Sequence, residues 1–198
     1  MVEVKVAILH EGNAGKSEDN WLLKALTAKL SEENPTLFNW DRVECYGMGG
    51  KSNFFKPDFP KYRSLLQLIE TDQISKVLFV MDADNEKNDA TYAGYENTFA
   101  AWQTFVSDTL KIEPISDIYI TCDPITRTGY VESLLLSTLD NDKKSCIETF
   151  LNCSDFKAKG NDKAILNQIY KTAYPNAPFD LQHSHFDELK QKLRILFS

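Results

Sequence analysis

The sequence lacks any long hydrophobic run and any paired cysteine motif. No stretch of the 198 residues approaches the roughly 20 consecutive apolar residues of a membrane-spanning helix. The first residues, MVEVK, are not followed by the apolar segment of a signal peptide. The cysteines show neither a CxxC motif nor a zinc-type spacing, and they are Cys45, Cys122, Cys146 and Cys153. We therefore expect no membrane contact, a cytoplasmic location and free thiols.

Positive charge is also scarce. The chain carries 22 Lys and Arg against 29 Asp and Glu, a formal net charge of −7. A chain this acidic does not hold nucleic acid by bulk charge, so such binding would need a local basic groove, a bridging cation or a partner. The length and the 42% hydrophobic content suit one substantial core and are too small for two comfortable domains.

Apolar runs and helical periodicities alternate along the first 140 residues. The pattern predicts strands at 2–9, 41–46, 76–84 and 118–120, with helices at 17–34, 61–72 and 93–110 between them and another helix after residue 129. Such alternation is typical of βαβ units, so we expect an α/β, Rossmann-like fold with a mostly parallel four-stranded sheet and helices on both faces. Residues 141–198 are expected to form a helical extension that packs on the same domain.

The first predicted helix has clear boundaries. Ser17 is a good N-cap, and Asn34-Pro35 ends the element. Large apolar residues recur at a spacing of three to four, at Trp21, Leu22, Ala25, Leu26 and Leu30. We therefore expect this stripe to face the core.

The chain is organised around the stretch 76–84, KVLFVMDAD. Five apolar residues indicate a strand buried on both faces. If the strand continues through Asp84, the side chains of Asp82 and Asp84 point the same way at the carboxyl edge of the sheet. Two carboxylates this close either share a proton or share a cation, although solvated acidic pairs are also common in loops.

Two motifs together carry a resemblance to a known domain. Glu11-Gly12 follows the apolar run VAIL, and Asp82-Ala83-Asp84 follows VLFVM. This order resembles the Toprim domain of topoisomerases, primases and OLD-type nucleases, over roughly residues 3–136. The later stretch 129–136, with the helical tail, is similar to small stand-alone Toprim proteins.

The resemblance implies a function and a site. Asp82 and Asp84 would hold Mg²⁺ or Mn²⁺, for which carboxylate oxygens are suitable ligands, and Glu11 would be a general acid/base or a further ligand. Gly12 would let the backbone approach a phosphate.

Further residues are candidates for the same site. Glu132 and the pair Glu18 and Asp19 would complete a second metal site, as in the OLD-like branch, although the spacer 13–17 before the pair is longer than that branch usually has. Lys51 follows the glycine-rich loop 47–50, and Arg127 lies before the last helix of the domain. Both are predicted phosphate contacts, and both have the alternative of being ordinary surface charges.

Two other motifs point elsewhere and are set aside. The stretch 12–17, GNAGKS, resembles a nucleotide-binding P-loop but has two residues between glycine and Gly-Lys-Ser where that loop requires four. His183 and His185 have no carboxylate or cysteine at metal-site spacing.

The leading hypothesis is a Mg²⁺-dependent, nuclease-like hydrolase acting on phosphodiesters of DNA or RNA. The alternative is a non-catalytic Toprim module that binds metal or phosphate and contacts a protein partner. The OLD-type resemblance makes an ATPase one such partner.

Overall fold

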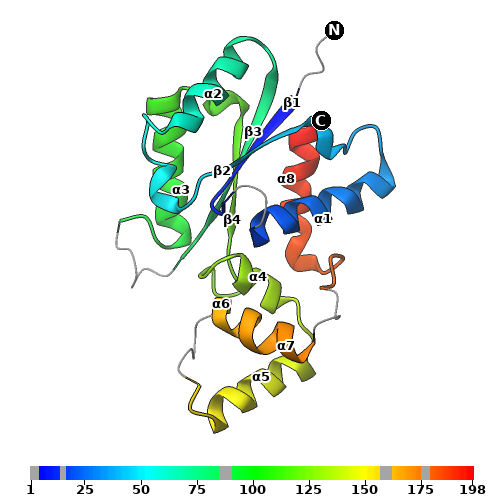
Figure 1. Ribbon diagram of the computed structural model, residues 1–198. Helices are drawn as coiled ribbons and strands as arrows, with labels where there is room; N and C mark the ends of the chain where they lie inside the picture. The colour runs from blue at the N-terminus through cyan, green and yellow to red at the C-terminus, as the bar shows by residue number, and fades with distance from the viewer. Residues whose placement is uncertain (1–4, 14–16, 85–90, 157–161, 175–178) are drawn as a thin grey trace.

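The computed structural model describes residues 5–13, 17–84, 91–156, 162–174 and 179–198. A four-stranded sheet lies at its centre, with helices on both sides (Figure 1). The strands are β1 Lys5–His10, β2 Val43–Gly47, β3 Ile74–Asp82 and β4 Ser116–Thr121. Their order is β2-β1-β3-β4, and every neighbouring pair is parallel. The α/β prediction is therefore confirmed, with a sheet that is entirely parallel.

Burial on both faces explains why the strands are continuous apolar runs. In β1, Val6 and Ile8 face one hydrophobic cluster while Ala7 and Leu9 face the other. The side chains of β3 alternate in the same way. Helices α2 and α3 cover one face, and α1 and α8 cover the other (Figure 1). The sheet is thus a middle layer, as expected for parallel strands.

The helical elements follow the predicted pattern with small shifts at their ends. The main ones are α1 Glu18–Glu33, α2 Pro60–Glu70, α3 Tyr95–Thr104, α4 Val131–Ser137, α5 Asn141–Cys153 and α8 Asp187–Phe197. Helix α3 continues as a π-helical turn, η3 Phe105–Leu110. Between α5 and α8, α6 Asp162–Ala164, the π-helical η5 Ile165–Tyr170 and α7 Lys171–Ala173 follow one another directly. Short 3₁₀ turns occupy Trp40–Arg42, Lys51–Asn53, Glu113–Ile115 and Ser184–Phe186.

The C-terminal helices share a hydrophobic cluster with the sheet. Ile147 of α5, Leu166 of η5 and Leu193 of α8 belong to the cluster that contains Ile8 and Leu78. The division into residues 1–140 and a helical extension at 141–198 stays a prediction. The shared cluster is consistent with an extension that packs on the same domain.

Two expectations are wrong. The strand 76–84 ends at Asp82, and Asp84 has a left-handed backbone with φ 61°. The two carboxylates are therefore not held by one extended segment. Trp21 does not join the core, because 43% of its surface is exposed, whereas Leu22, Leu26 and Leu30 are buried as expected.

Some predicted segments lie outside the described residues: 2–4 of the first strand, 14–16 of the P-loop-like stretch, and 85–90 of the loop after β3. Within the described part of the chain, no helix combines the length and apolar character needed to cross a bilayer. The four cysteines are free.

Candidate functional site

A cavity of about 430 Å³ opens at the carboxyl edge of the sheet, where β1 and β3 end beside the first turns of α1 and α4. Acidic side chains dominate its wall: Glu11, Glu18, Asp19, Asp82 and Glu132. Among the described residues that line it, Lys163 is the one cation. Ligand sites of parallel sheets lie at this edge. The excess of negative charge favours a cationic ligand.

Glu11 is held by two backbone amides. Its Oε1 accepts from Lys51 N at 3.0 Å and its Oε2 from Asp82 N at 3.1 Å. The carboxylate thus joins the end of β1 to β3 and to the loop after β2. Burial, followed by the charge of Asp84, raises the pKa of Glu11 to about 7. Glu11 can therefore take up or release a proton near neutral pH.

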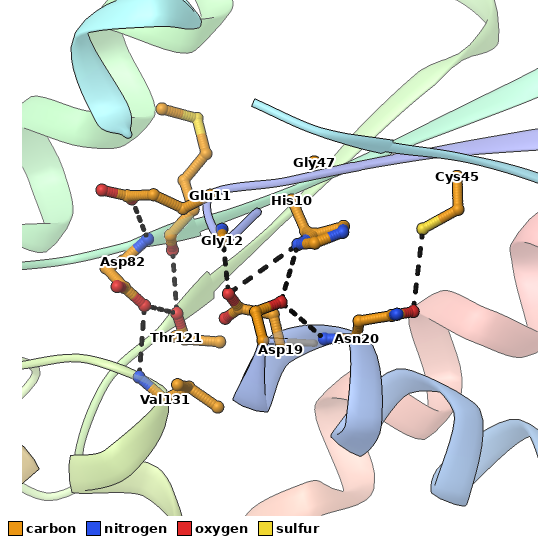
Figure 2. Close-up of polar contacts among 12 residues, drawn as sticks. His10, Glu11, Gly12, Asp19, Asn20, Cys45, Gly47, Asp82, Thr121 and Val131 are labelled. Atoms are coloured by element: carbon orange, nitrogen blue, oxygen red, sulfur yellow. Dashed lines mark hydrogen bonds and ion pairs between the residues drawn. The ribbon is translucent and has the colours of Figure 1, made fainter. Parts of the chain in front are cut away.

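Asp82 is fixed by its neighbours on one oxygen (Figure 2). Its Oδ1 accepts from the Thr121 hydroxyl and from the Val131 amide, the latter at 3.2 Å. No described residue donates a hydrogen bond to Oδ2. Burial, with the charges of Glu11 and Asp19 next, holds the pKa of Asp82 well above its usual range. A proton or a cation would relieve this crowding.

Asp19 ties the start of α1 to the end of β1 (Figure 2). Its Oδ2 accepts from Gly12 N at 3.1 Å and lies 3.8 Å from Nδ1 of the fully buried His10. Ser17 caps α1 by accepting from Asn20 N, and its hydroxyl lies 3.4 Å from the same His10 nitrogen. The predicted N-cap is thus confirmed, and it also holds the cavity wall together.

Gly12 is needed because α1 begins so close to it. A Cβ on Gly12 would lie 2.2 Å from Ser17 Cβ and 2.8 Å from Asp19 Oδ2. We expect Gly12→Ala to lower the free energy of unfolding by about 1–3 kcal/mol through overpacking. Urea denaturation checks this. Adding Ser17→Gly removes the nearest atom at the cost of a weaker cap, so the double variant should recover part of the loss. An unchanged stability in Gly12→Ala would contradict the close packing.

Glu18 and Glu132 complete the acidic wall. Glu132 is 3% exposed, in the first turn of α4, and its Oε1 lies 3.6 Å from Lys163 Nζ. Burial raises the pKa of Glu132, and the neighbouring acids Asp19 and Glu18 act in the same direction. Glu18 forms a salt bridge with Lys171. The candidates from α1 and α4 therefore do meet Glu11 and Asp82 in one cavity.

Asp84 and Lys51 pair with each other beside this cavity and do not line it. Lys51 is 7% exposed. Its ammonium lies 2.6 Å from Asp82 O, 3.2 Å from Ala83 O and 3.1 Å from Asp84 Oδ2. An ammonium has three hydrogens, and each has an acceptor here. Phosphate binding by Lys51 would require one of these bonds to break.

Arg127 lies away from the acidic cavity. Its guanidinium stacks 3.8 Å over the Tyr95 ring, and its Nη1 lies 3.2 Å from Glu96 Oε1. The side chain is 54% exposed, so these contacts do not bury it. A phosphate contact by Arg127 stays a prediction, and it would be made outside the cavity.

The described residues contain no group of three or more His, Cys, Asp and Glu side chains already arranged to hold a metal ion. The carboxylates that face the cavity are nevertheless the hard oxygen donors that Mg²⁺ takes, and Mg²⁺ keeps several waters when it binds. The donor chemistry therefore fits a hydrated ion held by one or two carboxylates, and it does not form a closed protein cage.

Sequence reasoning missed three residues of this site. His10 is buried beneath Asp19, and its Nε2 has no hydrogen-bond partner in the described structure. Thr121 and Lys163 contact Asp82 and Glu132. Thr121 ends the strand next to β3, which was a usable signal, whereas nothing in the sequence relates Lys163 to Glu132.

The two motifs set aside have other roles in the described structure. Gly12 and Ser17 pack against each other at the start of α1. The rings of His183 and His185 are in edge contact, and His185 Nδ1 lies 2.8 Å from the Ser137 hydroxyl.

No family model matches the sequence, and comparisons with curated proteins and with solved structures gave no significant match.

Proposed function

We propose that this chain is a Toprim-like, Mg²⁺- or Mn²⁺-dependent hydrolase that cleaves phosphodiesters of nucleic acid in the cytoplasm. One observation carries the proposal: five carboxylates line one cavity at the carboxyl edge of a parallel sheet. Burial and mutual repulsion raise the pKa of three of them, Glu11, Asp82 and Glu132. A site with such an excess of negative charge is suited to a divalent cation that in turn receives a phosphate.

Asp82 is the first candidate ligand, because no described residue occupies its Oδ2. Asp19, Glu18 and Glu132 are the candidates for the remaining contacts, directly or through water. A bound divalent ion supplies positive charge to the phosphate oxygens and lowers the pKa of water near them. Asp84 stays a predicted ligand, although its Oδ2 forms a salt bridge with Lys51 and the residue does not line the acidic cavity.

Glu11 is the candidate proton carrier. Two backbone amides fix its carboxylate, so the position of the carboxylate does not depend on a donor from another side chain. In the metal-free protein its pKa is raised to about 7, and a carboxyl group whose pKa is raised toward neutrality suits general acid/base catalysis. Lys163, which is exposed beside Glu132, is placed to contact a substrate phosphate in the role expected for Lys51.

The second candidate function is a non-catalytic module that binds a cation or phosphate and a protein partner, such as an ATPase. The observation that favours it is that the two basic side chains expected to contact phosphate are already engaged: Lys51 by three oxygens, and Arg127 by Tyr95 and Glu96. This module would retain metal binding in the acidic cavity and lack turnover.

The test is cleavage of end-labelled single- and double-stranded DNA and RNA with Mg²⁺, Mn²⁺ or EDTA. We expect metal-dependent cleavage by the wild type and its loss in Asp82→Asn, which keeps the acceptor for Thr121 and Val131 but removes the charge. Asp117→Asn is a matched control, because Asp117 pairs with Lys192 near the amino end of β4. It should cleave like the wild type.

Two results separate the candidates. Cleavage that persists in Asp82→Asn, or in EDTA, would refute the proposed site. No cleavage of any substrate, together with Mn²⁺ binding that Asp82→Asn abolishes, would favour the non-catalytic module.

A further inference from the structure

A second cavity adjoins the acidic one and differs from it in chemistry. The two share Ser17 and Glu18 in their walls. The second has a volume of about 450 Å³, and Trp21, Lys24, Lys171 and Phe179 contribute to its lining. It therefore combines aromatic rings with basic side chains, directly beside a site whose charged side chains are acidic except for Lys163.

Trp21 is exposed although it is a large aromatic residue on a helix that packs against the core. Its exposure is 43%, compared with 8% for Trp102. Its ring meets Phe179 edge to face, with centroids 5.9 Å apart and planes at 63°. Phe179 packs in turn on Tyr170, at 5.6 Å. The indole is thus held in place on one side and open to solvent on another, which is the arrangement that a stacking partner needs.

The basic side chains come from two helices that pass both cavities. On the segment α6–η5–α7, Lys163 and Asn167 line the acidic cavity, and Lys171, another four residues on, lines the second one. On α1, Glu18 lines both cavities, and Trp21 and Lys24 lie one and two turns beyond it. Each helix therefore presents one continuous stripe that leads from the acidic site to the aromatic one.

The charges of the two cavities complement different parts of one polyanion. Glu18 is the one acid among the described residues that line the second cavity, and it pairs with Lys171, while the Lys24 ammonium lies 5.6 Å from the centroid of the Trp40 ring. Two lysines against one carboxylate leave a net positive charge, so a phosphate can bind there without a bridging cation if it takes the place of Glu18 at Lys171. The first cavity, with five carboxylates and one lysine, requires a cation before it can receive a phosphate. A strand that crosses both would place one phosphodiester at the acidic site and the next nucleotide at Trp21.

We propose that the second cavity binds an unpaired nucleotide next to the phosphodiester at the acidic site, with its base stacked on Trp21 and its phosphate at Lys24 and Lys171. An exposed indole can stack on any base whose face is free, whereas a paired base in a duplex is already stacked. The substrate is therefore single-stranded nucleic acid. This inference rests on the proposed function, because the phosphodiester and the stacked base belong to the same strand.

The test measures binding without turnover. A labelled dT10 oligonucleotide is titrated in EDTA, and binding is followed by anisotropy and by the quenching of tryptophan fluorescence. We expect Trp21→Ala to weaken binding by about ten-fold and Trp21→Phe to retain most of it, since a phenyl ring still stacks. Phe99→Ala is the matched control, because Phe99 is also exposed, at 38%, on α3 across the sheet. It should bind like the wild type.

The lysines are tested by salt dependence. The double variant Lys24→Gln/Lys171→Gln should bind less tightly and show a shallower dependence on salt, with the slope of log K against log[salt] reduced by about 0.7 for each phosphate that is no longer neutralised. Lys29→Gln is the control on the same helix, because Lys29 pairs with Glu32. Circular dichroism of each variant shows whether the contact of residue 21 with Phe179 is needed for folding. Trp21→Phe keeps the test valid if Trp21→Ala unfolds.

The outcomes distinguish this inference from the proposed function. Equal affinity of Trp21→Phe, Trp21→Ala and wild type, or duplex binding as tight as single-strand binding, would overturn the stacking site. Asp82→Asn in EDTA should bind the oligonucleotide at least as well as the wild type, because it removes a negative charge. A protein that binds and quenches but does not cleave would refute the hydrolase and leave the nucleotide site in place.

Discussion

Replacing Lys51 with methionine is expected to lower the free energy of unfolding by about 3–5 kcal/mol, the cost of breaking a buried ion pair by removing one partner. The ammonium is the partner of two carbonyl oxygens and of the Asp84 carboxylate. Methionine fills a similar volume, so the loss would come from these three acceptors. Denaturation in urea at pH 7 measures it.

Two further variants identify the source of this loss. Lys56→Met removes an exposed lysine that contacts Asn53 in the same region, and it should change stability by less than about 0.5 kcal/mol. Adding Asp84→Asn to Lys51→Met removes the unpaired charge. Asparagine tolerates the left-handed backbone at residue 84, so the double variant should be more stable than Lys51→Met. If it is not, the carbonyl oxygens account for the interaction.

The metal-free protein is expected to be less stable at pH 8 than at pH 5. The pKa of Glu11 rises from 4.5 to about 7 on folding, so the folded state binds the proton more tightly than the unfolded state does. Its contribution is complete below pH 4.5 and is lost as the pH rises through 7. A shift of this size corresponds to about 3 kcal/mol. Asp82 and Glu132 act in the same direction.

Mg²⁺ should remove this dependence. A cation among the carboxylates replaces the protons, so the melting temperature at pH 8 should rise with Mg²⁺, by the equivalent of about 2.7 kcal/mol at 100 times the dissociation constant. Asp82→Asn should show a shallower pH dependence and a smaller response to Mg²⁺, whereas Asp117→Asn should match the wild type. A metal-free protein that is equally stable at pH 5 and pH 8 would argue against crowded, buried carboxylates.

The fold was largely predictable because its signals are local. Five apolar residues before Asp82 indicated a strand buried on both faces, and Ser17 marked the start of α1. Trp21 was misassigned because a periodicity of apolar residues does not reveal where the stripe leaves the core. Its ring contacts Phe179, which lies far along the chain, and remains 43% exposed.

The candidate site was predictable only in part. Glu11 and Asp82 end neighbouring strands, so topology brings them together. Glu132 joins them because α4 begins at Val131, whose amide donates a hydrogen bond to Asp82 Oδ1. Asp84 was wrongly expected to continue the strand, because the sequence Asp-Ala-Asp is equally compatible with a strand and with a turn. The contact between the Lys51 ammonium and Asp82 O, 31 residues apart, depends on tertiary packing alone.

The all-parallel sheet also has a consequence for how the protein folds. Leu9 pairs with Phe79, and parallel neighbours cannot be joined by a tight hairpin. The acidic cavity therefore comes into existence only after a long stretch of chain has closed between β1 and β3, and after α4 has followed. Contacts this distant in sequence slow folding. A cation that binds the finished cavity should consequently slow unfolding and leave the folding rate unchanged.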